Sequence, residues 1–401
     1  MRNTISSNNL LGNITIALWI IWRPLSVWVL HFDGAGRVPL LFLALFLLCN
    51  YKEVIRNATT KPMCFLTFSC VWSFINGHIK NSYVLLDTLE PFPLVSHVLI
   101  PLAICQVSII CFKSNFDKTL KVLSRSLVFY AFLAIVFNNS MGGDERMELT
   151  SININEVVLY CAIGVGVMFV RYVNGTVNKF ELCMVIFPAL VCVLAGSRMG
   201  LLSFFIICFA LLVSKVDLSK PKNIIPFVLG LIIVYFSIDY FLHNTFAGER
   251  ILGTQEELNE RYADFKTGTV LDFLGDRGFM YYYSWPYFLG HPITGIGIYN
   301  YIPNSPWGMR LHTEYATQYV ENGLLGFIPF IMFLYILTKK MILIRKSSFG
   351  KNTYAPTTMI MGMLISVLFS NLVLWSFDMI CVFCVYAMVY VYIQKQRIVG
   401  I

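Results

Sequence analysis

Long apolar stretches separated by short polar ones run through almost the whole chain. A membrane-spanning helix needs about 20 mostly apolar residues, and about twelve stretches approach this length, some of them short or interrupted by a charge. These stretches are residues 11–32, 37–51, 62–80, 92–112, 124–139, 153–173, 180–197, 199–214, 223–243, 324–342, 356–375 and 377–394. The pattern predicts an all-α integral membrane protein with about twelve transmembrane helices in a single polytopic domain over residues 1–401.

One polar segment, residues 244–323, is much longer than the other connections. Its part 255–265 carries acidic residues at i, i+4 spacing, which predicts an amphipathic surface helix. The part 277–289 is rich in Phe, Tyr and Trp, which favour the membrane–water interface, and predicts a second helix that ends at a Gly-His-Pro turn. A third helix is predicted over 311–320, and Gly323 interrupts it before the next apolar stretch.

Basic residues gather in every second connection between the apolar stretches. With the N-terminus placed inside, the inner connections hold Lys52, Arg56, Lys61, Lys113, Lys118, Lys121, Arg125, Arg171, Lys179, Lys215, Lys220, Lys222, Lys339, Lys340, Arg345, Lys346, Lys351, Lys395 and Arg397. Cytoplasmic loops of membrane proteins carry such an excess of Lys and Arg. The charge pattern therefore predicts that both termini are cytoplasmic and that segment 244–323 is a large loop on the opposite, periplasmic side.

Composition narrows the class of protein. Only 13% of the 401 residues are charged and 57% are hydrophobic, whereas soluble domains are about 25% charged. The net charge of +8 comes from the basic connections, so it indicates membrane topology and contact with membrane lipid, not a nucleic-acid partner. No His, Cys and Asp set has zinc-site spacing and no glycine-rich segment has a nucleotide-binding pattern, so we expect no metal and no cofactor. Cys381 and Cys384 lie in an apolar run that we expect to face lipid, where they are interpreted as small packing residues.

Two arginines on the predicted outer side are candidates for binding an anion. Arg198 follows Gly196 and Ser197 between two apolar stretches, where an arginine needs an anionic partner and small neighbours let a ligand approach the backbone. The alternative is a turn arginine that reaches the outer interface. Arg277 lies in segment 244–323, and its planar fork of donors fits phosphate oxygens. The alternative there is a salt bridge with Asp276 or another acid of the loop.

His312 is the candidate for proton transfer, because an unperturbed histidine titrates at about 6.5. A lone histidine is more often structural, but polar residues accompany this one in the sequence. They are Arg310, Glu314, Tyr315 and Glu321. Two arginines and a histidine on the outer side indicate a pocket for a lipid diphosphate. Arg198 and Arg277 would hold the diphosphate, and His312 would take the proton from an attacking sugar hydroxyl.

The order of these motifs resembles the superfamily of O-antigen ligases and O-antigen polymerases, which are bacterial envelope proteins. The matching elements are Gly196-Ser197-Arg198-Met199-Gly200, then Asp276-Arg277 followed by Trp285, then His291-Pro292-Ile293-Thr294-Gly295-Ile296-Gly297 with Tyr299, and finally His312 followed after ten residues by Gly323-Leu324-Leu325-Gly326. They cover roughly residues 190–330, while the first 180 residues agree in topology only.

The resemblance implies a metal-independent, inverting glycosyltransferase of the bacterial inner membrane, with a membrane-embedded fold like that of the GT-C class. Its donor would be an oligosaccharide linked to undecaprenyl diphosphate. The diphosphate-binding arginines of the family would correspond to Arg198 and Arg277, and its essential histidine to His312. Members differ in acceptor, because ligases transfer the glycan to lipid A–core and polymerases transfer it to another lipid-linked repeat unit.

The choice between the polymerase and the ligase interpretation rests on one residue. The ligase pattern has Asn, Ser or Gln directly after the histidine, and Thr313 departs from it, which favours an O-antigen polymerase of lipopolysaccharide biosynthesis. A polymerase of this kind implies a chain-length regulator and a flippase as further partners. An O-antigen ligase is the alternative. A multi-spanning transporter or lipid flippase also fits twelve spans, but transporters place ionisable groups at mid-membrane on broken helices, whereas polar residues here gather in segment 244–323.

Overall fold

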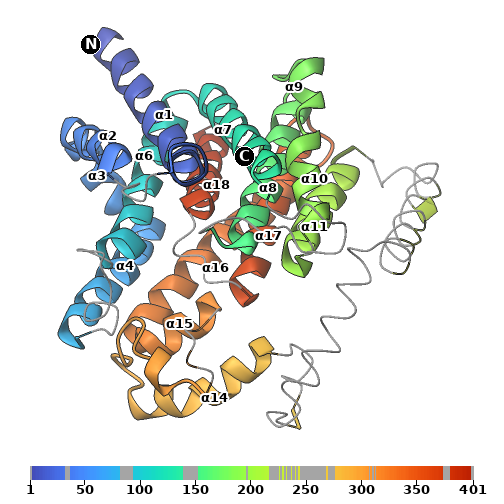
Figure 1. The fold of residues 1–401 in the computed structure, drawn as a ribbon. Helices are drawn as coiled ribbons and strands as arrows, with labels where there is room; N and C mark the ends of the chain where they lie inside the picture. The colour runs from blue at the N-terminus through green and yellow to red at the C-terminus, as the bar shows by residue number, and fades with distance from the viewer. Residues whose placement is uncertain are drawn as a thin grey trace.

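The computed structural model describes residues 2–31, 37–81, 94–138, 152–195, 197–215, 276–306, 308, 311, 313–373 and 380–398, and isolated residues between 225 and 269. Within these residues the chain forms helices and turns and no strand (Figure 1), which confirms the all-α prediction for this part of the chain. The elements are α1 (Arg2–Pro24), η1 (Leu25–Val29), α2 (Arg37–Cys49), α3 (Tyr51–Ala58), α4 (Lys61–Ile79), η2 (Val95–Leu99), α6 (Ile100–Ser114), α7 (Phe116–Val136), α8 (Ile154–Val173), α9 (Lys179–Cys183), α10 (Ile186–Leu194), α11 (Arg198–Lys215), α14 (Asp276–Gly290), η5 (Ile302–Asn304), α15 (Glu314–Glu321), α16 (Gly323–Ser348), α17 (Tyr354–Val373) and α18 (Ile380–Ile398).

The apolar helices make the chain a multi-pass membrane protein. Among the described residues, five helices are long and apolar enough to cross a membrane, or six if α2 and α3, which are bent by 83°, form one span. Three further apolar helices are shorter, at Ile100–Ser114, Met199–Lys215 and Ile380–Gln396. Each predicted apolar stretch contains a helix where the structure describes it, and stretch 223–243 lies mostly outside the described residues. The number twelve stays a prediction.

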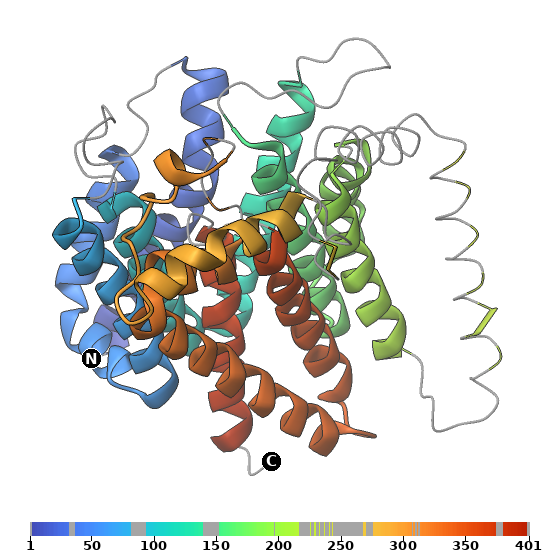
Figure 2. The same ribbon diagram turned by 90° about the horizontal axis from the view of Figure 1, so that it is seen from below.

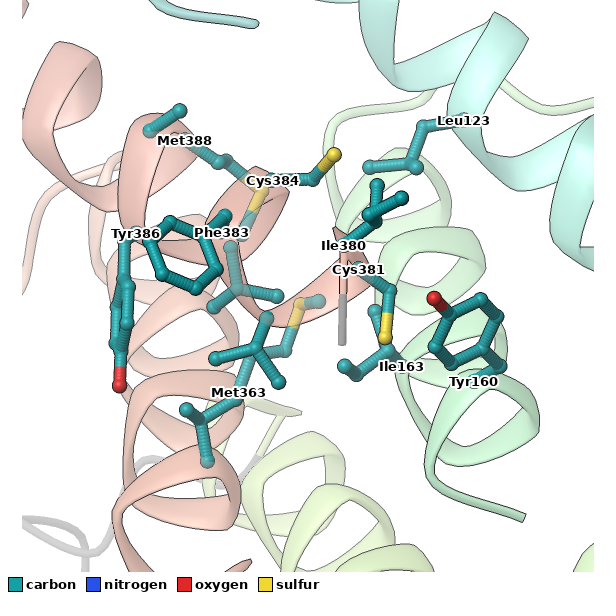
Figure 3. Close-up of a cluster of buried hydrophobic side chains, with 14 of the residues drawn as sticks. Leu123, Tyr160, Ile163, Met363, Ile380, Cys381, Phe383, Cys384, Tyr386 and Met388 are labelled. Atoms are coloured by element: carbon teal, nitrogen blue, oxygen red, sulfur yellow. The ribbon is translucent and has the colours of Figure 1, made fainter. Parts of the chain in front are cut away.

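α18 is a central helix of the bundle. Its residues from 380 to 393 are all buried, and Figure 3 shows several of them, between Ile380 and Met388, among side chains of α7, α8 and α17. The expectation that this run faces lipid is wrong, because a helix inside a membrane protein is as apolar as one that faces lipid. Cys381 and Cys384 are fully buried free thiols, and the Sγ of Cys384 lies 3.4 Å from the Oγ of Ser108. Both cysteines are therefore packing residues of the core.

One face of the bundle, called the basic face below, consists of the ends of α3, α6, α8, α11 and α18 and the start of α7. Lys113 Nζ donates to Asn57 Oδ1 at 2.6 Å, which joins α6 to α3. Lys395 Nζ lies 4.8 Å from the ring centroid of Phe116, and Lys215 Nζ lies 4.5 Å from that of Tyr172 at the end of α8. These lysines come from connections that are far apart in the sequence and all predicted to be cytoplasmic, so the fold gathers them on one side.

The opposite helix ends meet on a second face, called the site face below. Arg23 at the end of α1 donates to Glu156 at the start of α8 at 3.2 Å, and Ser197 before α11 donates to Asn155 at 2.9 Å. Asn300 donates to the backbone oxygen of Lys80, directly after α4, at 3.3 Å. α14 lies crosswise to α17 and α18 (Figure 2), which is the orientation expected for an aromatic helix at a membrane interface.

Segment 244–323 contains three described helices, α14, η5 and α15. α14 confirms the helix predicted over 277–289 to within one residue at each end. α15 begins at Glu314, and not at 311 as predicted, because Thr313 has extended backbone angles and caps the helix. The helix predicted over 255–265 lies outside the described residues.

Candidate functional site

A polar stripe on α4 holds the junction between α15 and α16. Ser69, Trp72 and Asn76 donate side-chain hydrogen bonds of 2.9, 2.8 and 2.9 Å to the backbone oxygens of Gly326, Asn322 and Glu321, respectively. Glu321 is the last residue of α15, where backbone acceptors lack intrahelical partners, whereas the oxygen of Asn322 also accepts from the nitrogen of Gly326 in α16. The stripe was not predicted from the sequence, although polar residues at i, i+3 and i+7 inside an apolar stretch are a signal for a contact between helices.

The turn 291–297 packs against the same junction. The backbone nitrogens of Ile296 and Gly297 donate to the oxygens of Val320 and Glu321 at 3.1 and 2.9 Å, and those of Leu324 and Leu325 donate to Pro292 and Ile293 at 2.8 and 3.1 Å. Gly295 and Gly323 have φ of +72° and +61°. A Cβ on Gly295 would overlap the carbonyl of Glu321, and one on Gly323 would overlap the nitrogen of Gly295. Two motifs that are separate in the sequence therefore form one structural unit.

Both predicted supporting acids are interior groups. Glu314 is 0% exposed and Glu321 is 2% exposed. Gln318 Nε2 donates to Glu314 Oε1 at 2.8 Å, while Gln318 Oε1 accepts from Asn322 Nδ2 and from Ser69 Oγ, each at 3.3 Å. A buried carboxylate is costly unless it is hydrogen-bonded. The amide of Gln318 thus links the carboxylate of Glu314, the first residue of α15, to Ser69 of α4.

Tyrosines join α14 and α15 to the last turns of α17. Tyr315 OH donates to Leu368 O at 3.2 Å and Tyr281 OH donates to Leu372 O at 3.5 Å. Burial raises the pKa of Tyr315 to about 12, although a hydrogen bond with Asn371 opposes the shift. Burial also raises the pKa of Tyr281. Both phenols are therefore neutral hydrogen-bond donors near pH 7, and they fix α14 and α15 to one end of α17.

The predicted site residues lie at or near the starts of three helices, α11, α14 and α15. Arg198 is the first residue of α11 and Arg277 the second of α14. Their side chains lie outside the described residues, as do Arg310 and His312 altogether. Tyr315, Glu314 and Glu321 are described and lie on α15.

The backbone brings the starts of α11, α14 and α15 to the same end of α17. Tyr281, one turn after Arg277, shares a side-chain hydrogen bond with Thr313, the residue that follows His312. α11 and α17 pack so closely that a Cβ on Gly362 would overlap that of Ala210, and the two helices run antiparallel (Figure 2). The first turn of α11 therefore points to the end of α17 that binds Tyr281 and Tyr315.

Arg23, for which the sequence suggested no role, belongs to the same face. It pairs with Glu156 at 3.2 Å, and the adjacent Asn155 accepts from Ser197, the residue before Arg198. Ser197 Oγ also accepts from the backbone nitrogen of Gly200 at 3.4 Å and thus caps α11. Asn155 and Glu156 were not predicted from the sequence as site residues. Their signal is the position of two polar residues at the outer start of an apolar stretch.

Residues 183–331 match a family model described as O-antigen ligase. This segment is an O-antigen ligase family domain. The domain runs from the end of α9 to the first turns of α16, and it contains Arg198, Arg277 and His312. The resemblance drawn from the motifs over roughly 190–330 is confirmed, and the family implies a glycan-transferring membrane enzyme of bacteria. No curated protein matches the chain.

Proposed function

We propose that the protein is an O-antigen polymerase, which joins oligosaccharide repeat units carried on undecaprenyl diphosphate at the periplasmic face of the inner membrane. The observation that carries the proposal is that the starts of α11, α14 and α15, all within the family domain, meet at one place. Arg198, Arg277 and the residue after His312 all belong to segments that converge on the end of α17. Helix N-termini favour anions, since their free N–H groups and dipole attract negative charge.

The proposed reaction is a single displacement at the anomeric carbon of the donor sugar. An acceptor hydroxyl attacks this carbon and forms the new glycosidic bond, while the bond to undecaprenyl diphosphate breaks. His312 takes the hydroxyl proton as general base. The guanidinium groups of Arg198 and Arg277 offset the charge that develops on the departing diphosphate. Attack from the face opposite the leaving group inverts the anomeric configuration.

Thr313 is the residue that favours a polymerase over a ligase, and it also has a structural task. Its side chain accepts from the backbone nitrogen of Ala316 at 3.2 Å and caps α15. Ser and Asn, which follow the histidine in the ligase pattern, cap helices as well as Thr does. Capping therefore does not separate the two acceptor classes. The ligase, which the family description names, is the second candidate function.

The proposed roles are tested with point variants in cells that make long-chain glycan. His312→Ala and Arg277→Ala should each abolish long-chain glycan while the protein stays in the membrane, since a general base contributes about 100- to 10,000-fold in rate. Arg277→Lys keeps the charge and loses the planar fork, so it should be impaired as well. His78→Ala is the control, because His78 is an exposed histidine at the end of α4 on the site face. Full-length glycan in His312→Ala would contradict the assigned role.

The acceptor is decided by one gel of lipopolysaccharide from a deletion strain. Loss of a polymerase leaves core capped with a single repeat unit. Loss of a ligase leaves bare core and an accumulation of lipid-linked polymer. Unchanged lipopolysaccharide with lost export of another lipid-linked molecule would favour the transporter, which the family domain makes the weakest of the three candidates.

A further inference from the structure

A cavity of about 550 Å³ opens between α7, α8, α9 and the start of α10, away from the site face. Most of its lining is apolar, with Val128, Phe129, Phe132, Met168, Phe180, Met184 and Phe187. Arg125, Asn178 and Glu181 complete the lining and make one end polar. Its volume is within the range of roughly 300–1,000 Å³ that is typical of small-ligand sites.

The polar end carries more positive than negative charge. The Glu181 carboxylate accepts from Arg171 at 2.5 Å and from Arg125 Nε at 3.1 Å, and Lys121 Nζ lies 4.0 Å away. Three basic side chains thus surround one acid, which leaves a net charge of two positive units. Arg171 is fully buried and also donates to Ser124 at 2.9 Å. By contrast, the side chains of Arg125 and Lys121 are 60% and 48% exposed, so they can contact a ligand at the mouth.

Polarity changes along one side of α7. Arg125, Phe129 and Phe132 are spaced at i, i+4 and i+7, so they share a helix face and span about 10 Å along the axis. Residues 126–136 of α7 contain no charged side chain. Phe132 meets Phe187 of α10 edge-on at 5.7 Å between ring centroids. The cavity therefore runs from a cationic mouth near the basic face into an apolar groove.

We propose that this cavity binds an anionic phospholipid of the leaflet at the basic face, with the headgroup phosphate at Lys121 and Arg125 and one acyl chain along Phe129, Phe132 and Phe187. A phospholipid has the same order of parts, an anionic head followed by an apolar chain. Basic side chains between membrane helices attract acidic headgroups, while a zwitterionic lipid gains no net attraction there. The proposal does not depend on the proposed transferase function, because it concerns another face of the molecule.

Native mass spectrometry of the purified full chain tests the proposal, with phosphatidylglycerol, phosphatidylcholine and inorganic phosphate as separate probes. We expect retained phosphatidylglycerol on the wild type and no comparable retention of the other two. Arg125→Gln should lower its occupancy about fivefold. Met184→Trp, which fills the groove and leaves every charge in place, should lower it as well. Lys346→Gln is the control, since Lys346 is an exposed lysine at the end of α16 that does not line the cavity.

Three results would overturn the proposal. Equal retention of phosphatidylcholine would mean unselective lipid contact. Binding of inorganic phosphate that survives in Met184→Trp would mean a simple anion site without a lipid chain. Equal losses in Arg125→Gln and Lys346→Gln would mean a general effect of surface charge. Circular dichroism of each variant confirms that it is folded, and if Arg125→Gln fails to fold, Met184→Trp decides alone.

Discussion

Gly323 is the residue on which the junction between α15 and α16 most depends. It has φ of +61°, and a Cβ there would overlap backbone atoms of Gly295 and Ile293. We expect Gly323→Ala to destabilise the protein by about 2 to 5 kcal/mol, because the left-handed conformation and the overlap both oppose a side chain. The measurement is thermal unfolding of the purified protein in detergent.

Gly350 provides the matched control for this prediction. It has a similar φ of +74°, but nothing lies within 4 Å of the position of its Cβ. Gly350→Ala should therefore cost only about 1 to 2 kcal/mol. Equal losses in the two variants would show that the contact between Gly323 and the turn 291–297 contributes nothing.

Thr313 offers a second prediction for a single residue. Its side chain is buried and caps α15, so Thr313→Ala should lower the free energy of unfolding by about 0.5 to 2 kcal/mol, while Thr313→Ser should stay close to the wild type. Thr313→Asn keeps a capping side chain and installs a residue of the ligase pattern. We expect it to leave the acceptor unchanged on a lipopolysaccharide gel. A switch to the ligase product would show that this position selects the acceptor.

At the scale of elements, Glu181 connects three helices. It lies on α9 and binds Arg125 of α7 and Arg171 of α8. Glu181→Gln would leave the fully buried Arg171 without its anion, so we expect a loss of about 3 to 5 kcal/mol. Glu53→Gln breaks an exposed ion pair with Arg56 on α3 and should cost less than about 1 kcal/mol. Similar unfolding temperatures for the two variants would contradict the structural role of Glu181.

The elements also show how far the sequence could predict the fold. The aromatic helix α14 was predicted closely, because its interfacial composition and its terminal turn are both local signals. The environment of α18 was predicted wrongly, because lipid and a protein interior select the same residues. The contact made by the polar stripe of Ser69, Trp72 and Asn76 on α4 was not predicted, because its partners on α15 and α16 lie about 250 positions further along the chain. For the candidate site, the motifs indicated which segments matter, while their meeting at the end of α17 is a property of the tertiary structure.

At the scale of the whole molecule, the two faces have different chemistry. The basic face gathers lysines from distant connections, while the site face gathers the starts of α11, α14 and α15, all of which lie inside the family domain. This separation is what a transferase needs if its lipid-linked substrates are used on one side of a membrane. The charge pattern predicts which side of the membrane each surface faces, and this can be tested because both surfaces have exposed residues for labelling.

Single cysteines on the site face and in a connection that is predicted to be cytoplasmic test the sidedness. His291 follows α14 on the site face, Lys346 lies near the end of α16, and both are exposed. In cells with a permeabilised outer membrane, a membrane-impermeant maleimide should label His291→Cys above the background of the native cysteines. It should label Lys346→Cys only after the inner membrane is disrupted, because positive loops stay in the cytoplasm. The wild type measures the background, since Cys49, Cys64 and Cys183 are exposed. Labelling of both variants while the inner membrane is intact, or labelling of Lys346→Cys alone, would contradict the predicted sidedness and would place the family domain's polar segment on the wrong side for a periplasmic polymerase.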